Sequence, residues 1–111
     1  MSTLRVAVAT KGSKGLDDEV SYEFGRAPAF TVIDIENNKV KNVKVVDNPA
    51  ASYEHGAGPI VVMTLADMKV EVVVAGEFGP GVSVFLKDRN IRTVKVAAET
   101  KVSQALNSVT R

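Results

Sequence analysis

The stretch FTVIDIENNKVKNVKVV, residues 30–46, decides the fold because it predicts two strands folded back on each other. Phe30–Glu36 and Val40–Val46 are rich in the β-branched residues that fit a pleated sheet. Between them stands Asn37-Asn38, and asparagine tolerates the positive φ that a tight hairpin turn requires. We therefore expect an antiparallel hairpin, in which one strand runs against the rest of the sheet.

The segment before the hairpin predicts a further strand and a long loop. Leu4–Thr10 alternates, with leucine and valine on one face and arginine and alanine on the other, which is typical of a strand. Lys11–Gly15 is a loop by its glycine and serine content. Leu16–Pro28 has no clean period, and a loop of this length in a compact domain is usually functional or disordered.

The segment after the hairpin alternates between helices and strands. Pro59 suits the first turn of a helix, and Thr100 suits the N-cap of another. VEVVVA is almost continuously apolar, as a parallel strand buried on both faces should be. We expect helices at about Ile60–Lys69, Val82–Arg89 and Lys101–Val109, and strands at Val70–Ala75 and Ile91–Val96.

For two of these helices, the sequence also predicts how their apolar residues are covered. In the second helix, Val82, Phe85 and Leu86 are expected on the buried side. In the first helix, the apolar residues Ile60–Met63 cover more of the helix circumference than a single buried face requires. Its outer part is expected to be covered either by the Leu16–Pro28 loop or by a partner chain, in a homodimer or with another protein.

The order of the elements predicts an α/β fold. Strands separated by helices are parallel and joined by right-handed crossovers, whereas the hairpin makes one strand antiparallel. A five-stranded mixed sheet in the order 3-2-1-4-5, with strand 2 antiparallel and helices on its faces, satisfies both constraints. This is a ribonuclease-H-like arrangement. We expect residues 1–111 to form a single domain with no internal repeat.

Composition narrows the class of protein. Hydrophobic residues make up 45% of the chain and charged residues 24%, which is enough for one core without metal or disulfides. A net charge of +1 gives no dominant attraction to nucleic acid or membranes. The absence of cysteine excludes thiolate catalysis and cysteine-ligated metal centres. With no leader pattern and no apolar run of roughly 20 residues, we expect a soluble cytoplasmic protein.

The sequence predicts no enzyme and no catalytic residues. Ribonuclease-H-type chemistry needs several carboxylates on the sheet to hold two metal ions, but Leu4–Thr10 contains no acidic residue. No G-x-S-x-G elbow is present, and the single histidine has no obvious nucleophile beside it. The lysine cluster of the hairpin lacks interleaved aromatics, so protection of a sheet edge explains it better than nucleic-acid binding.

Three glycine-bearing loops are expected to meet at one end of the sheet. In open α/β sheets, ligands bind beyond the carboxyl ends of the strands, and glycines let backbone N–H groups approach a ligand closely. Arg26 could clamp an anionic ligand there, or it could instead pair with an acidic residue of its own loop. The candidate cofactor-binding residues are Thr10, Gly12, Gly15, Arg26, Gly56, Gly58, Gly76, Gly79 and Gly81.

His55, within EHGAGP, is the candidate metal ligand. An imidazole coordinates iron readily, and this one stands just before the expected N-terminus of a helix, among glycines that leave space in front of it. A loop histidine can equally well hydrogen-bond its own turn. The residues alone leave both roles open.

Six segments together resemble one known family. They are RVAVAT (5–10), LDDEVSYEFGRAPAFTVIDIE (16–36), NPA (48–50), HGAGP (55–59), VVVAGEFGPG (72–81) and NIRTVKV (90–96). Their order and content are similar to the dinitrogenase iron–molybdenum cofactor biosynthesis family, which includes NifX, NifY and the C-terminal domain of NifB. The resemblance spans nearly the whole chain and implies a ribonuclease-H-like sheet. It also implies binding or carriage of cofactor precursors, which are iron–sulfur clusters.

One position departs from the family's pattern. The residue before FGR is often histidine in the family, and here it is Glu23. A carboxylate favours harder metals such as magnesium or manganese over iron–sulfur species. We expect a non-enzymatic carrier of an iron–sulfur or iron–molybdenum-type cluster, with His55 as a ligand. The alternatives are a crevice for a small phosphate- or carboxylate-bearing ligand without metal, and a protein-interaction module.

Overall fold

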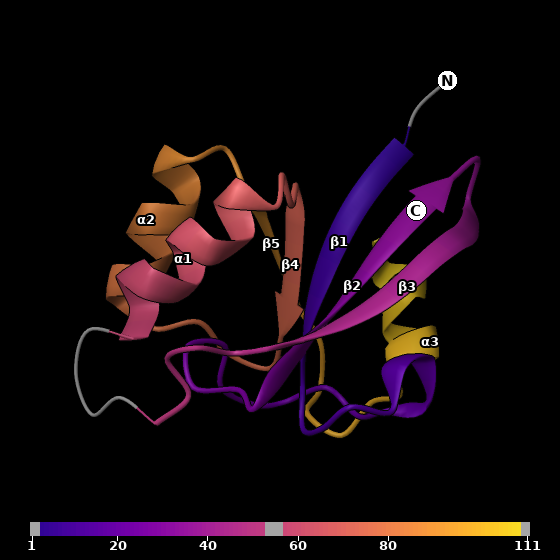
Figure 1. Ribbon diagram of the computed structural model, residues 1–111, viewed down its shortest axis with the longest axis horizontal. Helices are drawn as coiled ribbons and strands as arrows, with labels where there is room; N and C mark the ends of the chain where they lie inside the picture. Colours follow the sequence, from indigo (N-terminus) through magenta and orange to yellow (C-terminus); the bar gives the residue numbers. More distant parts are fainter. Residues whose placement is uncertain (1–2, 53–56, 110–111) are drawn as a thin grey trace.

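The computed structural model describes residues 3–52 and 57–109. It contains one five-stranded sheet in the order β3-β2-β1-β4-β5, as predicted (Figure 1). β2 runs antiparallel to β1 and β3, whereas β4 runs parallel to β1 and β5. The strands are β1 (Thr3–Thr10), β2 (Ala29–Glu36), β3 (Lys39–Asp47), β4 (Val72–Ala75) and β5 (Arg92–Lys95), and the helices are α1 (Ala57–Asp67), α2 (Pro80–Asp88) and α3 (Val102–Ala105).

The hairpin forms as its asparagines predict. Asn37 and Asn38 have φ values of 54° and 65°, the left-handed conformation that this turn needs. The register shifts between Asp34 and Ile35, so that β3 carries one extra residue opposite this point. β3 is an edge strand with mostly exposed residues, and the bulge and its lysines discourage further strand pairing there.

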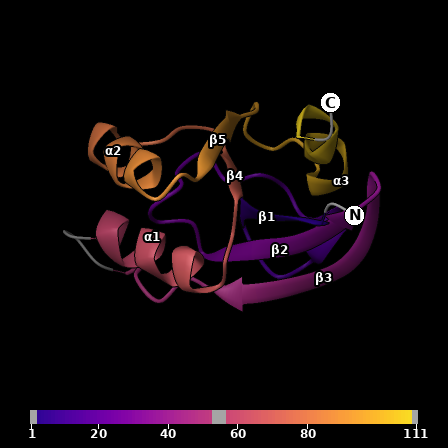
Figure 2. The same ribbon diagram turned by 90° about the horizontal axis from the view of Figure 1, so that it is seen from above.

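The sheet has a core on each face. Ala7 and Ala9 face one core, which α1 and α2 cover, whereas Val6 and Val8 face the other, which α3 covers. Figure 2 shows α1 and α2 on one side of the sheet and α3 on the other. The alternation predicted for β1 is therefore confirmed. β4 is buried along its whole length, as expected for a central parallel strand.

The helices differ from the predictions in their packing. In α2, Leu86 and Val82 lie one turn apart and take the inner side, so the predicted burial of Phe85 is wrong and its side chain is 43% exposed. On α1, Met63 is 52% exposed, so the Leu16–Pro28 loop does not cover this position. Cover by a partner chain stays a prediction.

The ends of two helices also differ. α1 begins earlier than expected, and the chain leaves it through Lys69, which has a φ of 64°. α3 is a short α-helix that continues as a 3₁₀ turn, Leu106–Ser108. Its N-cap is Lys101 rather than the predicted Thr100, because Thr100 belongs to the preceding turn, where its carbonyl accepts a hydrogen bond from the Val20 N–H.

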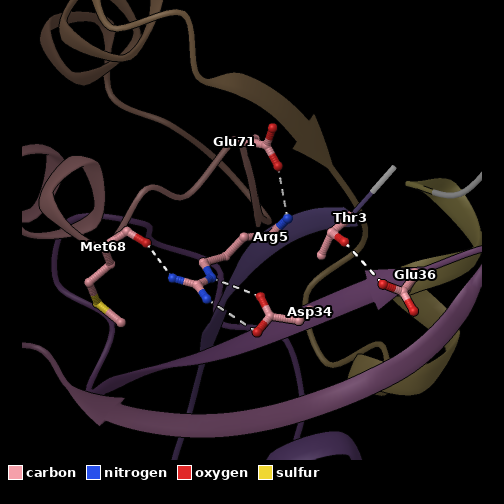
Figure 3. Close-up of polar contacts among 6 residues, drawn as sticks. All are labelled: Thr3, Arg5, Asp34, Glu36, Met68 and Glu71. Carbon is pink, nitrogen blue, oxygen red and sulfur yellow. Dashed lines mark hydrogen bonds and ion pairs between the residues drawn. The ribbon is translucent and has the colours of Figure 1, made fainter. Parts of the chain in front are cut away.

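Arg5 joins three elements at the end of the sheet where β1 and β4 begin (Figure 3). Its Nε and Nη2 donate to the two carboxylate oxygens of Asp34 on β2, at 2.7 and 3.2 Å. Its Nη1 donates to the Met68 carbonyl just beyond α1, at 2.7 Å. Its backbone N–H donates to the Glu71 carboxylate, at 3.0 Å. One side chain and its backbone thus tie β1 to β2, to the exit of α1 and to the approach to β4.

The ion pair makes this clamp dependent on pH. Hydrogen bonds from Arg5 hold the pKa of Asp34 below its usual range. The clamp therefore contributes its full stability above the ordinary aspartate pKa of about 4, and loses it as the pH falls through the lowered value.

Asp34→Asn should lower the free energy of unfolding at neutral pH by about 1–2 kcal/mol, since bonds to a charged group are lost from a partly exposed pair. Urea unfolding at pH 7 and pH 3 measures this, and the variant should lose less stability between the two than the wild type. Glu36→Gln on the same strand is the control, because its two contacts, with the exposed Lys41 and the Thr3 hydroxyl, are both long, at 3.4 Å, and should contribute less than about 0.5 kcal/mol. Equal effects of the two substitutions would contradict the clamp.

Candidate functional site

A segment of the chain itself fills the carboxyl ends of β1 and β4. Ser21 donates its N–H to the Ala9 carbonyl at 2.8 Å, and its carbonyl accepts from the Gly76 N–H at 3.0 Å. Val20 forms an antiparallel bridge with Thr10, the last residue of β1. The space at which a ligand was expected, directly between these strand ends, is therefore occupied by residues 20–24.

A cleft of about 460 Å³ lies just outside this inserted segment. It opens between residues 22–26 and the beginnings of α1 and α2, which in Figure 1 both start at the end of the sheet where the β4 arrow ends. Arg26, Gly58 and Gly79, three of the predicted binding residues, meet there. The full lining is Tyr22, Glu23, Phe24, Gly25, Arg26, Ala57, Gly58, Glu77, Gly79 and Val82.

A larger hollow, of about 610 Å³, lies at the opposite end of the sheet. It is bordered by Thr3, Glu71 and Arg92, at the amino ends of the parallel strands. Ligands of open α/β sheets bind beyond the carboxyl ends. The smaller cleft, where predicted residues also converge, is for this reason the better candidate site.

Two identical triplets lie side by side in the cleft. Glu23-Phe24-Gly25 and Glu77-Phe78-Gly79 are paired through a parallel bridge between Glu23 and Glu77. Phe24 donates its N–H to the Glu77 carbonyl at 3.3 Å, and the Phe24 and Phe78 rings pack with their centroids 5.1 Å apart. Both glutamates and both glycines line the cleft. The pairing of the two triplets was not predicted from the sequence, although the repeated E-F-G was a signal for it.

The glycines at this end of the sheet serve different purposes. A Cβ on Gly76 would stand 2.8 Å from the Tyr22 Cα, so glycine at this position leaves the space that residues 20–24 need. A Cβ on Gly58 would stand 2.5 Å from Cγ2 of Val82, so that glycine allows α1 and α2 to approach. Gly25, Gly79 and Gly81 have no heavy atom of the described chain within 4 Å of an added Cβ.

The other predicted binding residues lie elsewhere. Thr10 is buried, with its hydroxyl 3.1 Å from the Gly12 carbonyl and 3.3 Å from the Ala29 carbonyl. Gly12 borders a separate pocket with Lys14 and Asp18, and Gly15 is buried with a φ of 66°. None of these three, nor Gly76 or Gly81, lines the cleft as the structure describes it. His55 and Gly56 lie outside the described residues.

Lys95 controls the charge on one side of the cleft. Its Nζ lies 2.8 Å from Oε1 of Glu77, which also accepts the Phe78 N–H at 3.0 Å. The hydrogen bond from Lys95, together with that from Phe78, lowers the pKa of Glu77. Within residues 3–52 and 57–109, no three histidine, cysteine or acidic side chains come together to hold a metal ion. Over the same residues, no helix is long and apolar enough to cross a membrane.

Lys95→Gln should raise the pKa of Glu77 toward the ordinary glutamate value of about 4.3, because its strongest partner is lost. The carboxyl ¹³C shift of Glu77, followed by NMR between pH 2 and 7, measures this. Lys39→Gln at the hairpin tip should leave the Glu77 titration unchanged. An unaltered Glu77 titration in Lys95→Gln would contradict the pair.

Gly58→Ala should lower stability even though alanine is the better helix former. The new Cβ would overlap Val82, and overpacking costs about 1–3 kcal/mol against a gain of up to about 1 kcal/mol in helix propensity. Thermal unfolding measures the net loss. In the background of Val82→Ala, which removes the overlapping methyl, the same substitution should be neutral or stabilising. Destabilisation of the same size in both backgrounds would exclude the contact with Val82 as its cause.

Comparisons with known proteins agree with this fold and extend over most of the chain. The orange protein of Desulfovibrio gigas, in its apo form, is 33% identical, with a TM-score of 0.83 over 93% of this chain and 83% of that one. A candidate NifB protein from Thermotoga is 33% identical, with a TM-score of 0.77 over 96% and 86% of the two chains. An uncharacterized protein of Methanocaldococcus jannaschii is 28% identical over 90 residues, 81% of this chain and 75% of the relative.

A family model provides the assignment. The model described as "Dinitrogenase iron-molybdenum cofactor" matches residues 3–111, which includes both triplets and all five strands. This description and the NifB-type neighbour relate the chain to the biosynthesis or binding of the iron–molybdenum cofactor. The chain belongs to the dinitrogenase iron–molybdenum cofactor family.

Proposed function

We propose that this protein is a non-enzymatic carrier that binds an iron–sulfur-type metallocluster, or a precursor of such a cofactor, in the cleft. The observation that carries the proposal is the convergence of Arg26, Gly58 and Gly79, on three separate segments, around a space of about 460 Å³. Family membership supports a metal-containing cargo. The cargo enters and leaves, so the protein supplies a binding surface rather than a reaction.

The residues of the cleft favour a cargo that keeps its own ligands. The chain has no cysteine, so no thiolate can replace a sulfide or external ligand of a cluster. The lining offers apolar contact from Tyr22, Phe24 and Val82 and charged groups from Glu23 and Arg26. Packing and hydrogen bonds of this kind hold a preformed cluster without covalent exchange, and such binding is readily reversed.

His55 is the one imidazole that could add a direct bond to the metal. It lies two residues before α1, whose first residues, Ala57 and Gly58, line the cleft. Its role as a ligand stays a prediction, because it falls outside the described residues. Glu23, at the position often held by histidine in the family, does line the cleft. A carboxylate there is a hard donor, so His55 becomes the more important of the two positions for iron.

Anaerobic titration of the purified protein with a synthetic thiolate-ligated four-iron–four-sulfur cluster, followed by visible absorption, tests the proposal. Because the chain has no cysteine, thiolate capture cannot mimic specific uptake. We expect saturable uptake at one cluster per chain by the wild type. If His55 is a ligand, His55→Ala should bind at least about tenfold more weakly, which corresponds to roughly 1.4 kcal/mol.

The other outcomes separate the alternatives. Equal uptake by the wild type and His55→Ala would support the carrier function and exclude His55 as a ligand. No uptake by the wild type would contradict the carrier. Binding of inorganic phosphate, seen as NMR shift changes at Gly25 and Gly79, would then favour a metal-free anionic ligand. If neither probe binds, a protein-interaction module becomes the better explanation.

A further inference from the structure

Gly25 and Gly79 have neither of the two ordinary structural reasons to be glycine. The first reason is a left-handed backbone, but among the described glycines only Gly15 has a positive φ. The second is close packing, which explains Gly58 and Gly76. At Gly25 and Gly79, in contrast, an added Cβ would meet no described heavy atom within 4 Å. Both residues line the cleft.

The two glycines also occupy equivalent places. Each ends a Glu-Phe-Gly triplet, and the triplets are held in register by the bridge between Glu23 and Glu77. The phenylalanines are buried and packed on each other, so each glycine directly follows a fixed residue. The N–H groups of Gly25 and Gly79 donate to no other described residue. The result is a pair of glycines in the lining of one cleft, whose N–H groups meet no acceptor among the described residues.

We propose that Gly25 and Gly79 form the seat of the cargo, so that a compact cluster rests against bare backbone where side chains would exclude it. This rests on the proposed carrier function. The cargo surface that fits is one of hydrogen-bond acceptors, such as sulfide or oxo atoms, which can accept from the two N–H groups that no described residue accepts from. A methyl group on either glycine would enter the space that the cargo takes.

Gly79 has one competing explanation, because it is the N-cap of α2 and glycine is tolerated at that position. Serine distinguishes the two roles. It caps a helix at least as well as glycine, and it adds a Cβ and a hydroxyl to the cleft. If Gly79 is there for capping, Gly79→Ser leaves binding unchanged. If it is there for the cargo, the same substitution preserves the helix and weakens binding.

The test uses Gly25→Ala and Gly79→Ser with the four-iron–four-sulfur cluster titration, and Gly81→Ala as the matched control. Gly81 is equally open but lies outside the lining, in the first turn of α2. We expect each cleft variant to bind at least about tenfold more weakly than the wild type, with an unfolding temperature that is the same or higher. Gly81→Ala should bind like the wild type.

Each of the other possible results contradicts the proposed seat, and each points to a different reason. If the wild type and both cleft variants bind equally well, the seat is wrong and the carrier function stands. If the cleft variants bind weakly but also unfold at lower temperature, the glycines serve the fold and the seat is again wrong. If Gly81→Ala loses binding to the same extent, the effect is not specific to the cleft. If the wild type takes up no cluster, the carrier function and the seat fall together.

Discussion

The carboxyl end of the sheet depends on the two backbone hydrogen bonds of Ser21. Its N–H donates to Ala9 at the end of β1, and its carbonyl accepts from Gly76 just after β4. Residues 20–24 are therefore held between two strands that are neighbours in the sheet. This insertion satisfies backbone groups that would otherwise face a ligand or water. It also places the candidate binding space farther out, because the segment that occupies the usual ligand position becomes one wall of the cleft.

The insertion in turn depends on glycine, and the glycines of this chain show how little the residue type says by itself. Gly15 supplies a left-handed backbone, whereas Gly76 and Gly58 supply close approach to a neighbouring segment. Gly25 and Gly79 supply neither, and both line the cleft, where an added Cβ would meet no described heavy atom within 4 Å. In the sequence all five look alike. Only the surroundings of the missing Cβ separate a structural glycine from one that leaves space for a ligand.

The fold was predictable because local patterns determine it. Each of three patterns specifies one element: the alternation of Leu4–Thr10, the Asn37-Asn38 turn and the apolar run of β4. Because the connections between elements are short, these elements are compatible with only one strand order. The lining of the candidate site was predictable only in part. Gly58 and Gly79 both line the cleft, but the pairing of residues 20–24 with the strand ends joins distant parts of the chain without any periodic signal. This pairing separates Thr10, Gly12 and Gly15 from the cleft.

The charge of the cleft bears on the kind of binding that the site can support. Glu77 keeps its charge but shares it with Lys95, so its attraction for a cation and its repulsion of an anion are both reduced. Glu23 and Arg26 contribute opposite charges to the same lining. Among the described lining residues the charges are thus nearly balanced, so fit and hydrogen bonds contribute more to binding there than net charge does. Such a lining is consistent with the reversible binding that the proposed carrier function requires.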